Sequence, residues 1–474
     1  MSDQVTHPTV RFGRLEQRGV LLGLSGVQLA LTGAAAVVAT GALYAAGAAG
    51  LVVAAPVWLA LLAVGTVRVG GRPLTSWAPV VVGPGARRVT GTDREIATPE
   101  VPTRESLRLP GVPGTLAVAE GPYTRAALVW DRRAGTVCAI AAVSGPGFVL
   151  ADAGEQEHRV ATWGRVLAQL CHEPTVVRAQ VLTRTLPVST GAGPAWWRQQ
   201  VSDADRLPGR ILAELLEEAD RDAVRHETLV VLAVRPPRGT GRRLNGVRAR
   251  QVEVTLIALA DALSTAGLAV DHWVGVDDLP AVLSRSYDPA APILPAADGT
   301  SARVAVPTVG VVEAWDHLRT DTGVHRTFWV SEWPRTDVGP GFLQPLVLGA
   351  QWRTVSLIAE PLATERALRE IRRAHLEHAA DAAHRAKVGM VEDEAVRAER
   401  ADLAVREAEL VAGHGDFRFT GLVTLTASDL AGLDEATRAL RAAAAQSFCE
   451  VRPLVGQQAA AHLAGALPLA RGVR

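Results

Sequence analysis

The apolar residues of the chain are most concentrated near its N-terminus. Residues 19–67 contain no charged side chain and consist mostly of alanine, valine, leucine and glycine. One membrane crossing takes about 20 helical residues, whereas the apolar core of a signal peptide has only about 7–15. The pattern therefore predicts a transmembrane helical hairpin, with helices near 19–40 and 51–67 and a turn around 44–50.

Arginines flank this hairpin on both sides. They are Arg11, Arg14 and Arg18 before it, and Arg68, Arg72, Arg87 and Arg88 after it. Because cytoplasmic flanks of membrane helices are enriched in Lys and Arg, both termini are expected in the cytoplasm. The predicted protein is multi-pass in the plasma (inner) membrane, with residues 1–18 as a cytoplasmic tail and a large cytoplasmic domain.

Beyond the hairpin, the chain divides by composition into three parts. Residues 68–113 are rich in proline and glycine and predict a linker. Residues 114–300 and 301–474 are predicted as two cytosolic subdomains, because short apolar runs alternate there with helical patterns. This alternation indicates an α+β fold with ferredoxin-like β-α-β repeats.

The strongest elements of the two subdomains are these. Strands are expected at 126–130, 136–144, 175–185, 227–234, 268–274, 324–332, 353–360, 417–427 and 449–454. Helices are expected at 155–171, 207–222, 248–266, 276–284, 342–346, 430–445 and 457–464. A long charged helix is expected over 362–411, about 75 Å if unbroken, with Gly389 as its weak point.

Composition excludes several classes of protein. The chain of 474 residues has 49 basic and 49 acidic side chains, a balance that argues against direct nucleic-acid binding. Its only lysine, Lys387, lies outside any Walker A loop, which excludes a P-loop ATPase. Three cysteines lie far apart and form neither a disulfide framework nor a zinc motif.

Candidate metal and catalytic residues are few. His375 and His378 lie three apart on the charged helix, but a solvated helix face explains them better than a metal site. A Ser/His/Asp set can be assembled from Ser286, His317 and either Asp288 or Asp316, yet no G-x-S-x-G turn accompanies it. We therefore predict no catalytic residue, no cofactor and no metal. The interaction candidates are Trp196, Trp197, Trp315, Asp316 and His317.

Five short motifs extend over nearly the whole chain. They are Trp163-Gly164-x-x-Leu167-x-x-Leu170-x-His172-Glu173-Pro174, Ser286-Tyr287-Asp288-Pro289, Glu313-Ala314-Trp315-Asp316-His317, Thr322-Gly323-Val324 and the strand end Trp329 to Pro334. With the hairpin, they resemble an actinobacterial family of two-helix integral membrane proteins. Such proteins look to be encoded beside PrgI-like small membrane proteins and conjugation-type ATPases. The resemblance implies no catalytic residue.

The C-terminal half carries a second resemblance. After the charged helix come Phe417-x-Phe419-x-Gly421-Leu422-Val423-Thr424-Leu425-Thr426, a helix, a strand and a final helical segment. This order is similar to the N-terminal, non-motor domain of VirB/TrbE/TraC-class conjugation ATPases, which contacts a membrane complex. The resemblance implies the docking part of such a machine, without ATPase activity.

The sequence thus predicts a binding protein and not an enzyme. We expect a membrane-anchored structural or adaptor subunit of a type IV-like conjugation or secretion apparatus, docking an ATPase at the cytoplasmic face. Expected partners are a conjugation-type ATPase, a PrgI-like protein, the bilayer through 19–67, and further copies of the chain. The alternatives are a type VII secretion accessory subunit and a membrane-tethered hydrolase using Ser286, Asp316 and His317.

Overall fold

The computed structural model describes most of the chain. Described are residues 26–69, 72–77, 94–96, 106–112, 114–148, 151–187, 197, 207–221, 224–236, 244, 246–288, 310–334, 336, 338–388 and 394–472. They fall into two compact units, one holding residues 26–77 and the other holding the strands and helices of 94–454 and 458–472. Each unit is described by itself.

The N-terminal unit is built on two apolar helices. Its elements are α1 (Gly26–Val53), α2 (Ala55–Thr66), β1 (Arg68–Val69), β2 (Arg72–Pro73) and the 3-10 helix η1 (Leu74–Trp77). The first helix runs past the expected end at 40 and breaks at Ala46 and Gly47, where glycine adopts a φ of +61°. This break lies inside the turn predicted at 44–50. Residues 19–25 lie outside the described part.

The second arm of this unit is interrupted by proline. Ala54 separates the end of α1 from α2, and Pro56 has no N–H to continue the helical ladder. The arms pack together where Gln28 Nε2 donates to the Gly65 carbonyl at 2.9 Å. Of the described helices, α1 is the one long and apolar enough to cross a membrane, and α2 has only 12 residues. The two predicted crossings are therefore reduced to one candidate span near the N-terminus.

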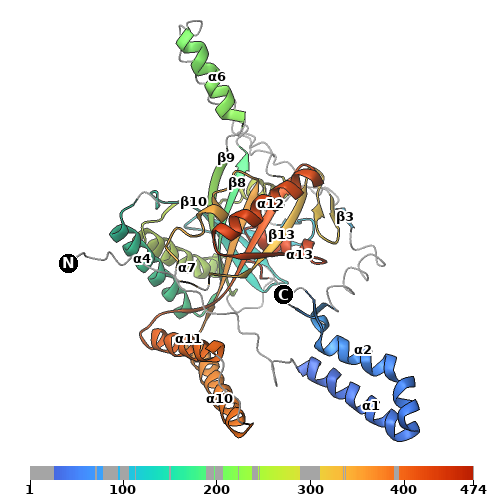
Figure 1. Cartoon of the computed structure of the whole chain (residues 1–474). Helices are drawn as coiled ribbons and strands as arrows, with labels where there is room; N and C mark the ends of the chain where they lie inside the picture. The colour runs from blue at the N-terminus through green and yellow to red at the C-terminus, as the bar shows by residue number, and fades with distance from the viewer. Residues whose placement is uncertain are drawn as a thin grey trace, which may run out of the picture. The chain divides into compact units, whose positions relative to one another are not determined.

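The other unit is organised by one large antiparallel sheet (Figure 1). Its strands are β3 (Arg94–Ile96), β4 (Ser106–Leu107), β5 (Leu116–Glu120), β6 (Ala127–Asp131), β7 (Thr136–Ser144), β8 (Val176–Pro187), β9 (Val224–Val234), β10 (Ala269–Trp273), β11 (Gly310–Glu313), β12 (Leu318–Arg319), β13 (Val324–Glu332), β14 (Arg353–Leu362), β15 (Asp416–Ala427) and β16 (Glu450–Pro453). The order is β3-β11-β12-β13-β15-β14-β8-β9-β7-β6-β5-β4, with β10 beside β7 and β16 beside β13.

Nine helices of this unit are described. They are α4 (Ala153–His172), α6 (Leu207–Arg221), α7 (Gly246–Thr265), α8 (Leu279–Ser284), α9 (Gln344–Val347), α10 (Thr364–Val388), α11 (Glu394–Val411), α12 (Leu430–Gln446) and α13 (Gln458–Gly465). These helices and the strands agree closely with the elements expected from the sequence, because the alternation of apolar runs and helical stripes was strong. The exceptions are the charged helix and the short strands β3, β4, β5, β11 and β12, which were not among the expected elements.

The sheet divides into two halves of the same topology. In the N-terminal half-sheet the strand order is β10-β7-β9-β8, and in the C-terminal half-sheet it is β16-β13-β15-β14. Every pairing within each half is antiparallel. A hairpin precedes each half (β5-β6 or β11-β12) and a short helix follows it (α8 or α13). The halves join where β8 and β14 pair antiparallel, so the two predicted subdomains share one sheet.

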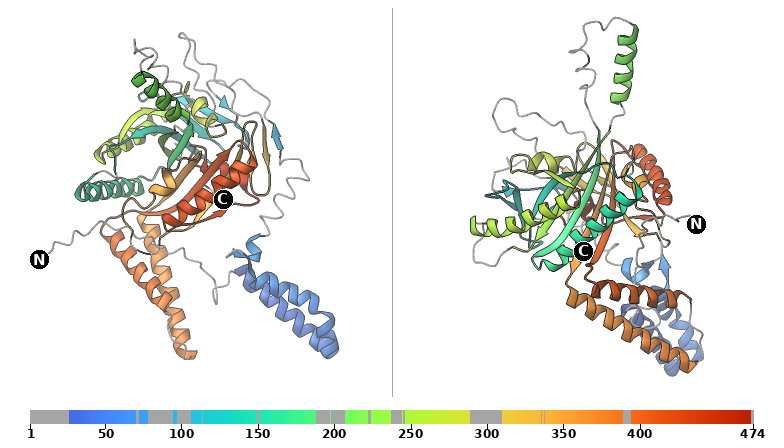
Figure 2. Two further views of the ribbon diagram at one scale, coloured as in Figure 1. Left: turned by 45° about the horizontal axis from the view of Figure 1, so that its top comes forward. Right: turned by 90° about the vertical axis from the view of Figure 1, so that its left-hand side faces the viewer.

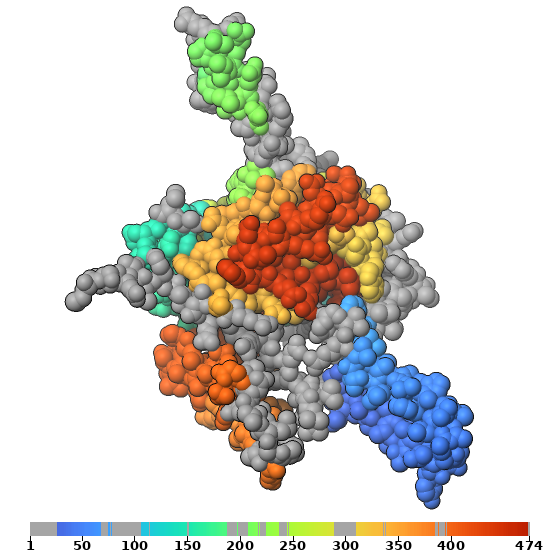
Figure 3. Space-filling model, in the orientation of Figure 1, coloured from blue at the N-terminus to red at the C-terminus, as the bar shows by residue number. Residues whose placement is uncertain are grey.

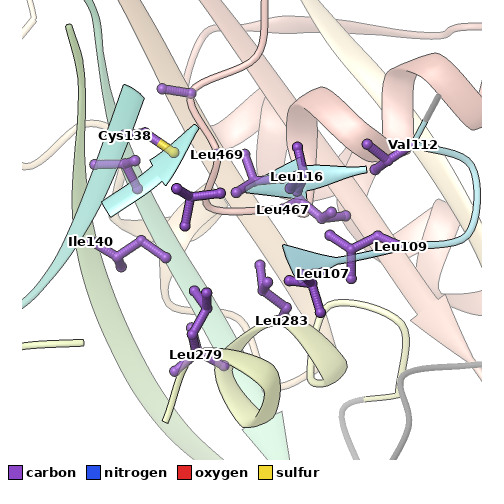
Figure 4. Close-up of a cluster of buried hydrophobic side chains, with 14 of the residues drawn as sticks. Leu107, Leu109, Val112, Leu116, Cys138, Ile140, Leu279, Leu283, Leu467 and Leu469 are labelled. Atoms are coloured by element: carbon purple, nitrogen blue, oxygen red, sulfur yellow. The ribbon is translucent and has the colours of Figure 1, made fainter. Parts of the chain in front are cut away.

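The N-terminal half-sheet is covered on both faces. On β7, Val137, Ala139 and Ala141 belong to the cluster that packs under α4 and α7. The alternate residues Cys138 and Ile140 belong to a second cluster with α8 and the C-terminal leucines (Figure 4). Because side chains of a strand alternate between faces, a run of apolar residues such as β7 is required for a strand buried on both sides.

The predicted single helix over 362–411 is wrong. The structure has two helices, α10 and α11, which fold back on each other as a helical hairpin (Figure 2). The chain between them, residues 389–393, includes the glycine named as the weak point and lies outside the described part. Doubling back lets the apolar residues of α10 be buried, which a solitary 75 Å helix would not allow.

Candidate functional site

Two helical insertions leave the sheet at equivalent points. The helix α6 lies between β8 and β9, and the α10–α11 hairpin lies between the corresponding strands β14 and β15. Because β8 and β14 run antiparallel, their insertions leave from opposite ends of the sheet. Figure 1 and Figure 2 show α6 and the α10–α11 hairpin projecting in opposite directions.

The α10–α11 hairpin has its own small apolar core. Buried in it are Leu362, Ala367, Ile371, Ala374, Leu403 and Leu410. At its edge His375 Nε2 lies 3.1 Å from Glu407 Oε2. His375, which the sequence analysis weighed as a metal ligand, thus pairs across the hairpin. No cluster of three His, Cys, Asp or Glu suited to a metal occurs among the described residues.

The base of this hairpin is fixed to the sheet by polar contacts. The Arg406 guanidinium holds the Asp416 carboxylate at 2.6 Å, and Cys171 Sγ lies 3.3 Å from the Asp416 carbonyl oxygen. Burial raises the pKa of the Cys171 thiol to about 11. The thiol therefore stays protonated at neutral pH and acts as a donor that joins α4 to β15.

The α6 helix has two different apolar faces. Gly209 is buried, and Ala213 and Leu216 on the same side are partly buried. The opposite side carries large apolar residues that remain exposed: Leu207 at 64%, Ile211 at 48% and Leu215 at 54%. Figure 3 shows the described part of α6 standing out from the body of the molecule. An exposed apolar stripe of this kind is typical of an interaction site.

The three consecutive candidates Trp315, Asp316 and His317 form the turn between β11 and β12. The Ala314 N–H donates to the His317 carbonyl and closes the turn. Trp315 is 41% exposed, whereas the Asp316 carboxylate contacts His317 Nδ1 at 2.9 Å and Arg326 Nη2 at 2.7 Å. These three residues therefore lie at the surface, with two of them in an ion-pair network.

Arg326 on β13 is the centre of that network. Its Nη1 also donates to Asp434 Oδ1 at 2.9 Å and to Thr437 Oγ1 at 3.1 Å, both on α12. Burial raises the pKa of the Asp316 carboxyl, but the hydrogen bond with His317 and the charge of Arg326 outweigh it and lower the pKa overall. The network thus connects the β11–β12 turn to α12, a stabilising role for residues that the sequence marked as interaction candidates.

The serine of the hydrolase alternative is not paired with this network. Ser286 follows α8 and is 5% exposed, and its Oγ has no hydrogen-bond partner among the described residues. A serine nucleophile must share a hydrogen bond with its histidine base. His317 instead uses Nδ1 for Asp316, and no hydrogen bond joins it to Ser286.

Of the two neighbouring tryptophans, only Trp197 lies in the described part of the chain. Trp196 lies outside the described residues. Trp197 is partly buried, and its indole Nε1 is buried without a partner in the described part of the chain. The two residues precede α6 in sequence, within the insertion between β8 and β9.

Sequence reasoning missed a buried polar cluster between β13 and α13. His325 is fully buried, with Nε2 3.1 Å from Thr320 Oγ1 and Nδ1 2.9 Å from Thr426 Oγ1. The ring of His462 lies 4.7 Å from that of His325, and neither nitrogen of His462 has a hydrogen-bond partner in the part of the chain that the structure describes. Burial lowers the pKa of His325 to about 4, and that of His462 falls well below its ordinary value for the same reason.

A second buried polar contact ties the C-terminal segment to the junction of the half-sheets. Gln180 on β8 donates to Ser356 Oγ at 2.8 Å and to the carbonyls of Ala464 and Leu467 at 3.2 Å. Its Oε1 accepts from Ala470 N at 2.7 Å. The segment after α13 is thereby fixed beside both halves. A lone glutamine in an apolar strand was the available signal.

The structure also contains a surface cavity of about 730 Å³ beside β5. Its polar lining includes Glu120, Arg125, Arg132, Asp277 and Asp278. Arg125 has a φ of +58° and pairs with Glu120 at 2.8 Å. None of the predicted site residues lines this cavity.

Comparison with known proteins adds no assignment. No protein-family model matches the chain, and no curated protein matches it.

Proposed function

We propose that the chain is a membrane-anchored structural or adaptor subunit of a type IV-like conjugation or secretion apparatus. In this proposal it docks a partner ATPase at the cytoplasmic face. The observation that carries a docking role is the pair of helical insertions, which leave two similar half-sheets at the same topological point. Insertions that project from a rigid sheet are suited to presenting surfaces to partners.

The anchor in this proposal is the whole hairpin. Residues 26–45 of α1 are helical up to the break, about 30 Å at 1.5 Å per residue, which matches the hydrocarbon core of a bilayer. The second arm, from 48 to 66, is helical on both sides of Ala54 and is interrupted at Pro56. Proline is tolerated inside membrane helices. We propose that these two arms are two crossings, with both termini and the sheet unit in the cytoplasm.

The fold assigned in this proposal is a pair of ferredoxin-like repeats. Each half-sheet has the strand order 4-1-3-2 when its own strands are numbered along the chain. The expected β-α-β-β-α-β order supports the resemblance to the non-motor domain of conjugation ATPases. That resemblance supplies the class of machine, and the sheet supplies a rigid body from which to dock.

The surface proposed for the ATPase is the outer face of α10. It carries exposed pairs four residues apart, Arg369 with Glu365 at 3.8 Å and Arg373 with Glu377 at 2.8 Å. Exposed ion pairs contribute little to stability, so these side chains are available to exchange partners. Contacts made by such a face are expected to weaken with salt.

The test is affinity purification of the tagged chain from its own membranes in mild detergent, followed by mass spectrometry. The double variant Arg369→Glu/Arg373→Glu reverses charge on α10, and Arg438→Glu on α12 is the matched control. We expect recovery of a conjugation-type ATPase and a PrgI-like protein, with only the ATPase lost in the double variant and at high salt. Recovery of type VII core subunits would instead indicate that the chain is an accessory subunit of a type VII secretion system.

A further inference from the structure

The stripe of Leu207, Ile211 and Leu215 on α6 lacks a cover in the described part of the chain, whereas the equivalent insertion is covered. In the C-terminal half-sheet, α11 lies on α10 and buries Ile371, Leu403 and their neighbours. In the N-terminal half-sheet, the insertion contributes one described helix of this length, and its stripe stays about half exposed. At the equivalent position of the other half-sheet, the cover is therefore a packed helix.

The stripe has the geometry of a helix-pairing seam. Its three residues are spaced by four, so at about 100° per residue they spread over only about 80° of the helix surface. Gly209, Ala213 and Leu216 lie on the opposite side, which is already covered. The open stripe is thus a second contact face and not the buried side of a surface helix.

The charges beside the stripe indicate how a second α6 helix would be oriented against the first. Arg210 and Glu214 are both exposed and lie on the same flank, about 100° and 60° from Ile211. In an antiparallel pair of identical helices, like flanks face each other; in a parallel pair, unlike flanks do. The other flank carries the uncharged residues Pro208 and Leu212. Glu214 and Glu218 also disfavour an anionic lipid surface as the cover.

We propose that α6 pairs antiparallel with α6 of a second copy of this chain. When the pair is centred on Ile211, Leu207 of one copy lies opposite Leu215 of the other. Arg210 then lies about 3 Å along the axis from Glu214 of the second copy, twice per pair. The contact is small, and anchoring both copies in one membrane raises its effective concentration. That last point alone rests on the proposed anchor.

The test is disulfide cross-linking of full-length single-cysteine variants in native membranes, in a Cys171→Ser background. Cys138 and Cys449 are buried and stay in place. Ile211→Cys is expected to cross-link to itself, at least tenfold above Glu157→Cys, an exposed site on α4 outside the face proposed for the ATPase. Leu207→Cys and Leu215→Cys are expected to cross-link to each other when co-expressed, and poorly to themselves.

A charge swap tests the register without altering the stripe. In the Ile211→Cys chain, Arg210→Glu places four acidic side chains at the contact and is expected to lower the cross-link yield severalfold. Adding Glu214→Arg restores the opposite-charge pairs and is expected to restore the yield.

Three results would overturn the proposal. One is an Ile211→Cys yield equal to that of the α4 control, Glu157→Cys. Another is strong self-cross-linking at both 207 and 215, which indicates a parallel pair. The third is a yield that does not respond to the charge swap. Retention or loss of the ATPase in the purification experiment has no bearing on these outcomes, so the two proposals fail separately.

Discussion

The two half-sheets share their strand order but differ in what fills them. The N-terminal half has a cluster of alanine, leucine and valine under α4 and α7, with Leu128, Leu232 and Leu256 at 0% exposure. The C-terminal half also has an apolar cluster under α9 and α12, but on its other face it buries His325, Thr327 and His462 between β13 and α13. Their insertions differ as well, because the α10–α11 hairpin covers itself and α6 leaves a stripe open. The same strand order is therefore compatible with different kinds of buried side chains.

The largest expected effect uses pH to separate the two interiors. The folded-state pKa values of His325 and His462 lie below the 6.5 of an unfolded histidine. As the pH falls below 6.5, the unfolded chain therefore binds more protons than the folded chain, and the free energy of unfolding decreases. Protonation of His325 is expected to lower the free energy of unfolding by about 2 kcal/mol between pH 6.5 and 5, and protonation of His462 lowers it further in the same direction. Urea denaturation of the detergent-solubilised chain from pH 7.5 to 5 measures this.

The matched variants assign this loss to the buried rings. His325→Gln is expected to remove about half of the slope, whereas His158→Gln, at an exposed site on α4, is expected to leave it unchanged. Equal slopes in both variants would mean that the C-terminal half-sheet is not the acid-sensitive part.

The next effect tests the junction that joins the halves. Gln180→Ala removes the side-chain partner of the Ala470 N–H and of the buried Ala464 carbonyl, whereas the Leu467 carbonyl still accepts from Leu469 N. We expect a loss of about 3 kcal/mol in the free energy of unfolding, since buried unsatisfied groups cost about 1–3 kcal/mol each. Gln169→Ala on the exposed face of α4 is the control, and a loss no larger than that of the control would contradict this role.

A pair of isoleucines compares the two insertions directly. Ile371→Ala opens a cavity in the core of the α10–α11 hairpin and is expected to cost about 2 kcal/mol. Ile211→Ala on α6 shortens a side chain that is about half exposed and opens no buried cavity, so the unfolding free energy of the chain at high dilution is expected to change by less than about 0.5 kcal/mol. Denaturant titration of both variants measures these free energies. Equal losses would contradict the view that the apolar residues of α10 are covered whereas the stripe of α6 is not.

The smallest effect concerns the ion pair across the α10–α11 hairpin. Glu407→Gln weakens the contact with His375, and both side chains are about two-fifths exposed. The expected loss is about 0.5 kcal/mol, vanishing at high salt, because solvent screens exposed pairs. A loss above about 2 kcal/mol that persists in salt would show that the hairpin depends on this pair and not on its apolar core.

Much of the secondary structure was predictable because local pattern dominates there. The strand expected at 324–332 is β13, and the hairpin of 126–130 with 136–144 is β6 and β7, closed by Asp131 accepting from two turn amides. The charged helix was wrong because its alternating charges carry no signal for doubling back. Only burial of Ile371 against α11 favours the break.

The candidate residues were harder to interpret from local pattern. Asp316 and His317 were recognised as a polar cluster, but their partner Arg326 comes from another strand and Asp434 from a later helix. The buried pair of His325 and His462 escaped notice because the residues are 137 positions apart and neither stands in a motif.

The sequence by itself determined the apolar helix near the N-terminus, the order of the longer strands and of most helices, and the absence of a Walker loop. These features depend on residue type and short-range periodicity, which any stretch of the chain carries within itself. Only the tertiary structure decided the joining of β8 to β14, the buried polar cluster between β13 and α13, and the open stripe of α6. Each of those depends on residues far apart in the chain, whose meeting is set by the packing of the whole.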